Sequence, residues 1–124
     1  MATKASEIEV DGVKYVPKSG VKQQADCLDG LTLCVIRTYS AGIWYGYIDY
    51  NAKDTFSGVV VRKAKRIWKW TGAFSLSEVS INGIGSDSKI AVELPEIKLN
   101  RAIELLPVSQ SAQTIIDSIA PYEV

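Results

Sequence analysis

The chain has 124 residues, and its 14 basic residues balance 14 acidic ones, so the formal net charge is zero. Hydrophobic residues make up 47% and charged residues 23%, which excludes a disordered chain, a collagen and a disulfide-dense toxin. The balanced charge favours neither nucleic acid nor a membrane surface, and no apolar run approaches the ~18 residues that a membrane helix needs. We therefore expect one compact domain.

The residue types that are missing narrow the chemistry. There is no histidine, which removes the commonest general base and metal ligand. Cys27 and Cys34 do not have a metal-binding spacing, and with no signal-peptide pattern before them they are expected to be reduced thiols, Cys34 in the core. Three carboxylate pairs stand in polar sequence that predicts solvated surface: Glu7/Glu9, Asp26/Asp29 and Glu93/Glu96. The inventory favours a binding protein over an enzyme, and predicts no cofactor, no metal and no catalytic residue.

The N-terminal region predicts a β-hairpin and a link. Residues 7–16 form two runs of alternating polar and apolar residues on either side of Asp11-Gly12, which is the strongest short hairpin signal. Pro17 ends the second run, and a polar stretch follows over residues 18–30. A two-stranded hairpin alone is marginal in water, so we expect it to dock on the main domain or on a neighbouring subunit.

Residues 31–70 predict a β-meander, because they show no helical periodicity. A near-continuous apolar run over 31–39 indicates a central strand covered on both faces, and Ser40-Ala41-Gly42 breaks it. An aromatic-rich strand containing Gly46 follows over 43–50. A turn over 51–58 precedes one long strand, or two short ones, over 58–70.

The remaining residues predict two helices and two strands. Ser75 can cap a short helix that runs through Ser80, with Glu78 completing a capping box and Gly83 ending the helix. Strands are expected at 89–94 and 97–106, divided by Pro95. The last segment is a helix that ends before Pro121 and has apolar residues at i, i+3, i+4 and i+7: Ala112, Ile115, Ile116 and Ile119.

These elements predict an α+β fold: a mostly antiparallel β-sheet with an N-terminal hairpin, a short middle helix and a C-terminal helix. Residues 1–30 are assigned to the hairpin extension and its link. Residues 31–124 are assigned to a single α+β ligand-binding domain.

The segment Arg62–Trp70 is the most informative for function, because it holds five positive charges and no negative one. Strict alternation would place Arg66, Trp68 and Trp70 on one face of a strand. Indole rings stack on bases and guanidinium groups grip phosphate, so this face suits a planar anionic ligand. The alternative is that Trp68 anchors the core and the lysines form a solvated edge.

Two further patches suit phosphate or ribose. Residues 37–42, Arg-Thr-Tyr-Ser-Ala-Gly, place Arg37, the hydroxyls of Tyr39 and Ser40, and small residues at a strand end. Their alternative reading is an ordinary turn with Arg37 paired to a carboxylate. Residues 71–77 lead into a helix N-terminus with Ser75 and Ser77, where anions bind well, although Ser75 is also explained as a cap.

Taken together, these segments resemble a known family. Arg-Thr-Tyr-Ser-Ala-Gly at 37–42, Arg-Ile-Trp-Lys-Trp-Thr-Gly-Ala-Phe-Ser-Leu-Ser at 66–77 and Ala-Ile-Glu-Leu-Leu-Pro at 102–107 are similar to a small bacteriophage domain, that of the first-described Thoeris anti-defence proteins. The resemblance covers residues 31–119 and leaves out the hairpin. Position 65 is arginine in the family pattern and Lys65 here, which keeps a charge but not the two-pronged guanidinium.

The resemblance implies a non-enzymatic sponge in the host cytoplasm. Such a protein binds a cyclic ADP-ribose isomer, in some members also cyclic trinucleotides, without cleaving it, and forms dimers or assemblies of dimers. Nanomolar retention requires about −12 kcal/mol. A stack and two phosphate contacts supply less, so we expect an enclosing lid or a second subunit.

The alternatives are a single-stranded nucleic-acid binding module and an enzyme that hydrolyses the signal. For the sponge, the expected ligand contacts converge on one enclosed hollow, with arginines on phosphate, aromatic rings on adenine and serines on ribose or phosphate: Arg37, Tyr39, Ser40, Arg66, Trp68, Trp70, Ser75 and Ser77.

Overall fold

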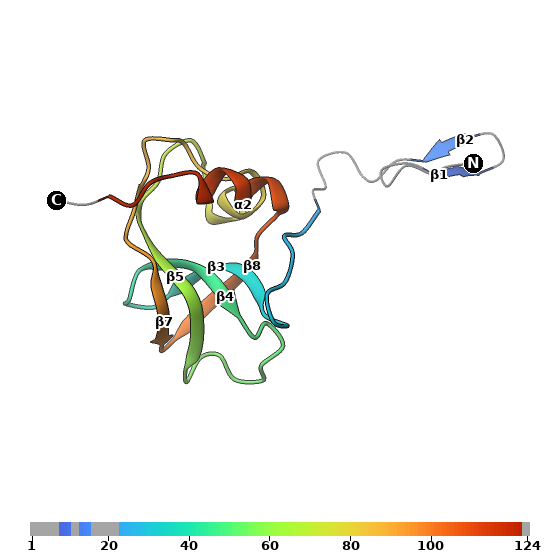
Figure 1. Cartoon of the computed structure of the whole chain (residues 1–124). Helices are drawn as coiled ribbons and strands as arrows, with labels where there is room; N and C mark the ends of the chain where they lie inside the picture. Colours follow the sequence, from blue (N-terminus) through green and yellow to red (C-terminus); the bar gives the residue numbers. More distant parts are fainter. Residues whose placement is uncertain (1–7, 11–12, 16–22, 123–124) are drawn as a thin grey trace.

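The computed structural model describes residues 8–10, 13–15 and 23–122, and shows the predicted α+β fold (Figure 1). Strands β1 (Ile8–Val10) and β2 (Val13–Tyr15) pair antiparallel, which confirms the two strands of the hairpin. The predicted turn, Asp11-Gly12, lies outside the described residues, as does the first part of the link. How the hairpin docks stays a prediction.

Six strands form the main sheet, and every pairing between them is antiparallel. Strand order is β6, β5, β4, β3, β8, and β7 lies beside β5 on the same side as β6. The bounds are β3 Thr32–Thr38, β4 Ile43–Ile48, β5 Val59–Lys69, β6 Lys89–Ile90, β7 Leu94–Leu99 and β8 Ala102–Pro107.

The sheet is strongly curled. Strands β7 and β8 lie at opposite edges, yet only Asn100 and Arg101 connect them. In a flat sheet these edges would be ~19 Å apart, whereas the connection from Leu99 to Ala102 spans at most ~11 Å. The curl gives the sheet an inner face and an outer face.

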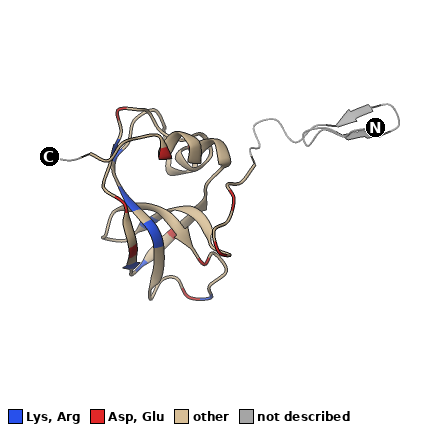
Figure 2. Cartoon of the chain, in the orientation of Figure 1, with Lys and Arg blue, Asp and Glu red and all other residues tan. Residues whose placement is uncertain are grey.

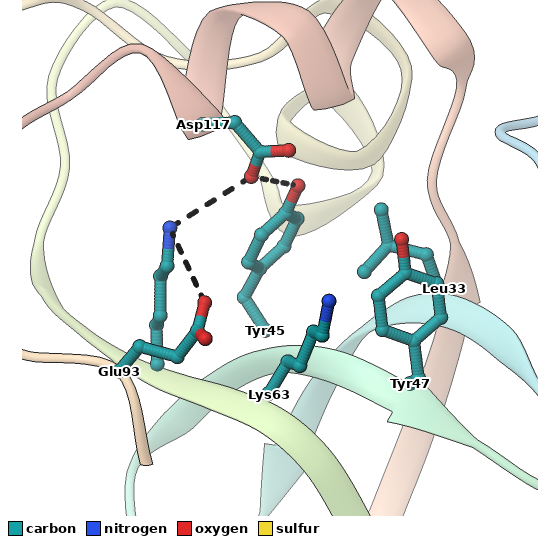
Figure 3. A pocket seen from close by; sticks show the side chains of 7 residues that line it. Leu33, Tyr45, Tyr47, Lys63, Glu93 and Asp117 are labelled. Atoms are coloured by element: carbon teal, nitrogen blue, oxygen red, sulfur yellow. Dashed lines mark hydrogen bonds and ion pairs between the residues drawn. The ribbon is translucent and has the colours of Figure 1, made fainter. Parts of the chain in front are cut away.

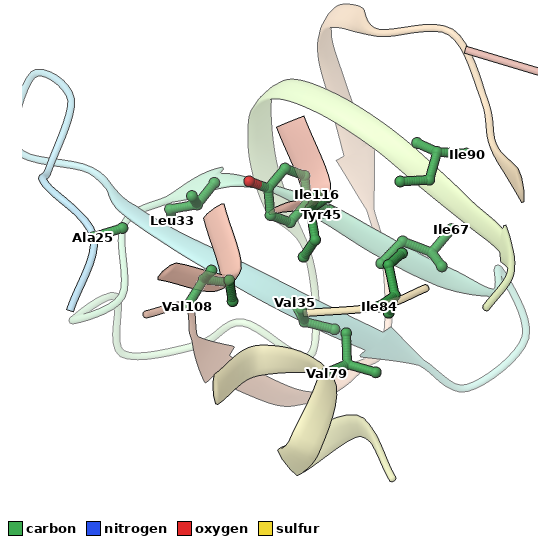
Figure 4. Close-up of a cluster of buried hydrophobic side chains, with 11 residues drawn as sticks. Ala25, Leu33, Val35, Tyr45, Ile67, Val79, Ile84, Ile90, Val108 and Ile116 are labelled. Carbon is green, nitrogen blue, oxygen red and sulfur yellow. The ribbon is translucent and has the colours of Figure 1, made fainter. Parts of the chain in front are cut away.

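Each face has its own hydrophobic core. The outer face packs against helices α1 (Leu76–Asn82) and α2 (Gln110–Asp117), with Val35 of β3 and Ile116 of α2 fully buried between them (Figures 1 and 4). The curled inner face encloses a second cluster, which includes Ile36 and Trp44. Among the described residues, no helix is long and apolar enough to span a membrane.

Residues 23–30, assigned above to the link, pack on the main domain. Ala25 is buried in the outer core, and its backbone N–H donates to the carbonyl of Val108 at 2.9 Å. Gln23 accepts a hydrogen bond from the backbone of Gln110 at 2.7 Å. This part of the chain is therefore held by the same core as the sheet.

The prediction for residues 89–106 was wrong in its boundaries. Pro95 lies inside β7 rather than between strands, which is possible because β7 is an edge strand where a missing N–H breaks no pairing. The predicted strand 97–106 is divided instead at Asn100 and Arg101, and Arg101 has a positive φ of 57°. Helix α1 runs to Asn82, two residues beyond the predicted end, before Gly83 caps it.

Strand β5 is one long strand, and two bulges change which way its side chains point. One extra residue lies at Lys63, between the pairs Tyr47–Arg62 and Tyr45–Lys65, and another lies at Trp68. Each bulge reverses the alternation. Residues therefore cannot be assigned to a face by counting in twos along this strand.

Candidate ligand-binding site

Arg66 is the centre of the candidate site. It pairs with Trp44 of β4, which pairs in turn with Ile36 of β3, so all three belong to a row on the inner face. The guanidinium carbon of Arg66 lies 4.8 Å from the centre of the Trp44 ring. Trp44 is only 4% exposed, and this stack holds the guanidinium, which forms no ion pair with a carboxylate among residues 23–122.

The turn between β3 and β4 lies against Arg66. Gly42 has a positive φ of 89°, and a Cβ built there would be 3.6 Å from Nη1 of Arg66. The hydroxyl of Thr38 accepts a hydrogen bond from the backbone of Ala41 and donates to the carbonyl of Gly42, both at 2.8 Å. These bonds fix the turn, and glycine lets a ligand approach its backbone.

A second arginine stacks on the same turn. The backbone N–H of Tyr39 donates to the carbonyl of Arg101 at 2.9 Å, and the guanidinium carbon of Arg101 lies 5.5 Å from the centre of the Tyr39 ring. Tyr39 is 69% exposed, and Ser40 is exposed beside it. We call the group of Tyr39, Ser40, Gly42, Trp44, Arg66 and Arg101 the arginine corner.

Trp68 is a further exposed aromatic ring on the same strand as Arg66. It is the extra residue of the second bulge, and its side chain is 70% exposed. The alternative reading of Trp68 as a core anchor is therefore wrong. Its open indole face can stack on a planar ring.

The other predicted contacts lie elsewhere. Arg37 pairs with Ile43 on the outer face and forms an ion pair with Glu104 at 3.2 Å, as its alternative reading proposed. Arg37 and Arg66 thus lie on opposite faces of the sheet, and the expectation of one hollow shared by both was wrong.

Trp70, Ser75 and Ser77 belong to the outer side as well. The bulge at Trp68 turns Trp70 away from the face of Arg66, and Trp70 packs against the outer core and donates from Nε1 to the carbonyl of Ala73 at 3.3 Å. The hydroxyl of Ser75 accepts from the N–H of Glu78 at 3.2 Å, so it caps α1. Ser77 is exposed on α1.

Figure 2 shows the basic residues along β5, and two of its five cations form ion pairs with acids among the described residues. Arg62 lies 3.8 Å from Glu96, and Lys65 lies 4.0 Å from Glu93 and 3.8 Å from Asp117. The partners come from β7, from the residue before it, and from α2. The basic run is therefore not an uninterrupted positive track in the folded protein.

A polar pocket of about 150 Å³ lies on the outer face between the sheet and α2 (Figure 3). Its lining includes Tyr45, Tyr47, Lys63, Lys65, Leu33, Glu93 and Asp117. The hydroxyl of Tyr45 donates to Asp117 at 2.9 Å, and burial, followed by the nearby Asp117 carboxylate, raises the pKa of Tyr45. Burial also raises the pKa of Tyr47, so both phenols are neutral donors at physiological pH.

Sequence reasoning missed Arg101 and Lys63. Arg101 is brought to the corner by the antiparallel pairing of β8 with β3, which puts Arg101 beside Tyr39, a contact that no local pattern predicts. Asn100, a turn former, was the only local signal for the connection that holds it. Lys63 stands in the basic run with no local feature that separates it from the other cations. Gly46, which lies opposite the bulge on the neighbouring strand, is the signal that could have found it.

The fold and the corner define an α+β domain with a curled antiparallel sheet and an arginine-rich, aromatic end. The chain belongs to the family described as a domain of unknown function, DUF6948, whose model matches residues 31–116. No curated protein and no solved structure matches the chain.

Proposed function

We propose that this protein binds and sequesters a cyclic ADP-ribose isomer at the arginine corner without cleaving it. The observation that carries the proposal is the pair of arginines, Arg66 and Arg101, each stacked on an aromatic ring beside one glycine-containing turn. A cyclic ADP-ribose offers a pyrophosphate for such guanidinium groups. The resemblance of segments 37–42, 66–77 and 102–107 to phage Thoeris anti-defence sponges supports this choice of ligand.

Different residues of the corner contact different chemical groups of the ligand in this proposal. Arg66 and Arg101 take the pyrophosphate, and the exposed rings of Trp68 and Tyr39 offer stacking faces for adenine, at ~1–3 kcal/mol for each stacked base. Ser40 offers a hydroxyl to ribose. The proposed role is to hold the host's immune signal in the cytoplasm, which requires no acid, base or metal.

Single-stranded nucleic acid is the alternative ligand, because Trp68 and Tyr39 are exposed rings next to cations. The ion pairs of Arg62 and Lys65 argue against it, since a phosphate track needs cations that are not already paired. Raising the salt concentration separates the two ligands, because binding to a polymer weakens steeply with salt.

Calorimetry with a panel of cyclic ADP-ribose isomers and cyclic oligonucleotides tests the proposal. Arg66→Ala and Arg101→Ala should each weaken binding by about tenfold or more, and Arg37→Ala should leave it unchanged because Arg37 lies on the other face. Denaturing the complex should release the ligand intact. Recovery of a hydrolysed product would indicate an enzyme, and wild-type affinity in both corner variants would exclude this site.

A further inference from the structure

Lys63 occupies an unusual backbone position. Its φ of 51° lies in the left-handed region, which non-glycine residues seldom adopt. Val61 and Ala64 both face the inner core, so the extra residue at the bulge is Lys63 itself. Strict alternation from Val61 would send residue 63 into the inner core. The bulge therefore turns Lys63 out of the core.

Gly46 accommodates this bulge on the neighbouring strand. A Cβ at Gly46 would lie 2.5 Å from Cγ1 of Val61 and 2.9 Å from the carbonyl oxygen of Arg62. Only glycine leaves room for the β5 backbone at this point. Two special residues on adjacent strands are thus required to bring one lysine to the outer face.

The side chain of Lys63 points into the pocket of Figure 3, between the rings of Tyr45 and Tyr47. Within residues 23–122, no carboxylate lies within 4.0 Å of its ammonium group. The hydroxyl of Tyr47 accepts a hydrogen bond from Nε2 of Gln113 at 3.2 Å, which leaves its own hydrogen free to donate. This end of the pocket therefore offers two donors, the Lys63 ammonium and the Tyr47 hydroxyl, while Asp26, outside the lining, contributes to the raised pKa of Tyr47.

The opposite end of the pocket carries the acids. Glu93 and Asp117 lie on either side of Lys65, and Asp117 also accepts from the hydroxyl of Tyr45. An anion would be repelled there, so its place is at the end where Lys63 and Tyr47 meet. A volume of about 150 Å³ admits a phosphate group but not a nucleoside with it.

We propose that Lys63 and Tyr47 form a binding site for a small oxyanion of the phosphate class, distinct from the arginine corner and on the opposite face of the sheet. A wider depression shares Lys63 and Glu93 with the pocket and is also lined by Leu28, Arg62, Pro95, Asp29 and Glu96. It leaves room for the rest of a phosphorylated molecule. Because three of these residues are acids, the part of a phosphorylated molecule that lies there must be neutral or basic. Free phosphate and a phosphorylated metabolite would both place an oxyanion at Lys63 and Tyr47. Only the metabolite would also occupy the depression.

The test uses the full chain and inorganic phosphate, with the side-chain amide signals of Gln113 in NMR spectra as a local reporter. Phosphate should shift these signals in the wild type. Lys63→Gly should weaken binding by about tenfold or more, while its melting temperature stays level or rises because glycine relieves the left-handed backbone. Lys63→Arg should retain binding, and Lys53→Ala, an exposed lysine away from the pocket, is the matched control.

Two outcomes would overturn the proposal. One is an absence of any phosphate-dependent shift at Gln113 in the wild type. The other is an equal shift in Lys63→Gly, which would place the anion elsewhere. A phosphate monoester such as glycerol phosphate that binds more tightly than phosphate identifies a metabolite as the ligand, and equal affinities identify phosphate itself. Neither result depends on the arginine corner, whose variants are measured with a different ligand.

Discussion

Single residues decide the shape of β5 more than its overall composition does. Strand propensity explains why Val59–Lys69 is extended, but Gly46 and the two bulges determine which side chains reach solvent. Arg66 and Lys65 are neighbours in sequence, and they contribute to different faces with different chemistry. The function of a charged residue here depends on its register.

Gly46 should tolerate no side chain. Gly46→Ala would force its methyl group against the β5 backbone, and we expect a loss of about 1–3 kcal/mol in the free energy of unfolding. Gly58→Ala is the matched control, because a Cβ there meets only the ends of the Lys98 and Asn100 side chains. Urea unfolding of both variants checks this. Equal stabilities would mean that the bulge can shift without cost.

The two cysteines should differ sharply in reactivity. Burial raises the pKa of the Cys34 thiol to about 12, so at pH 8 only about one molecule in ten thousand carries the reactive thiolate. Cys27 is exposed. An aromatic disulfide reagent should therefore modify one thiol per native chain at pH 8 and two after denaturation. Rapid modification of both native thiols would contradict the buried position of Cys34.

At the scale of elements, helix α1 depends on its cap. The hydroxyl of Ser75 accepts from the backbone of Glu78, and the Glu78 carboxylate accepts from the N–H of Phe74, the residue before the cap, at 2.9 Å. The first half of the predicted capping box is therefore present, and Glu78 reaches one residue beyond the second half. Ser75→Ala should lower the free energy of unfolding by about 1 kcal/mol, whereas Ser75→Asp should retain it. Thermal melts measure both.

The same variant addresses the predicted ligand role of Ser75. If that hydroxyl serves only as a cap, Ser75→Ala will bind the nucleotide as the wild type does, once both are compared well below their melting temperatures. A tenfold loss of affinity in a folded Ser75→Ala protein would instead show that α1 reaches the ligand.

Local patterns predicted most elements and few of the connections. Alternation, capping and turn residues predicted β3, β4, β5 and both helices, because each depends on nearby residues. The break at Asn100 and the inclusion of Pro95 in β7 depend on which strand lies beside them, and a single strand carries no such signal.

The site was predicted less well for the same reason. Arg66 and Tyr39 were identified from residue type, whereas Trp70 was placed with Arg66 by counting in twos and Arg37 was chosen as a charge at a strand end. A bulge reverses that count, and antiparallel pairing puts Arg37 in the row of Ile43 on the outer face. Arg101 enters the corner through the pairing of β8 with β3, two strands that are far apart in the sequence.

The formal net charge of the whole molecule is zero, but its charged side chains are distributed differently on the two faces of the sheet. On the outer face of β5, Arg62 and Lys65 form ion pairs with acids, whereas the inner-face corner stacks Arg66 and Arg101 on rings. Stacking fixes a guanidinium without neutralising it. Selective attraction of a small anion therefore does not require a net positive protein.

The proposed homo-oligomer is a property of the whole molecule. Tyr39 and Trp68 present wide exposed rings, and one such surface alone provides too few contacts for nanomolar binding. A homo-oligomer that covers the corner would supply the remainder, and it stays a prediction. Light scattering on the ligand-free and ligand-bound protein measures the number of chains.

The limits of the folded domain give the last prediction. Because Ala25 is buried and residues 23–25 hydrogen-bond to Val108 and Gln110, a chain that starts at residue 23 should melt close to the full chain. A chain that starts at residue 31 loses this packing and should melt lower by about 5–15 °C. Calorimetry of the three chains compares them directly. Equal melting temperatures would move the boundary back to residue 30 and make the packing of residues 23–30 incidental to stability.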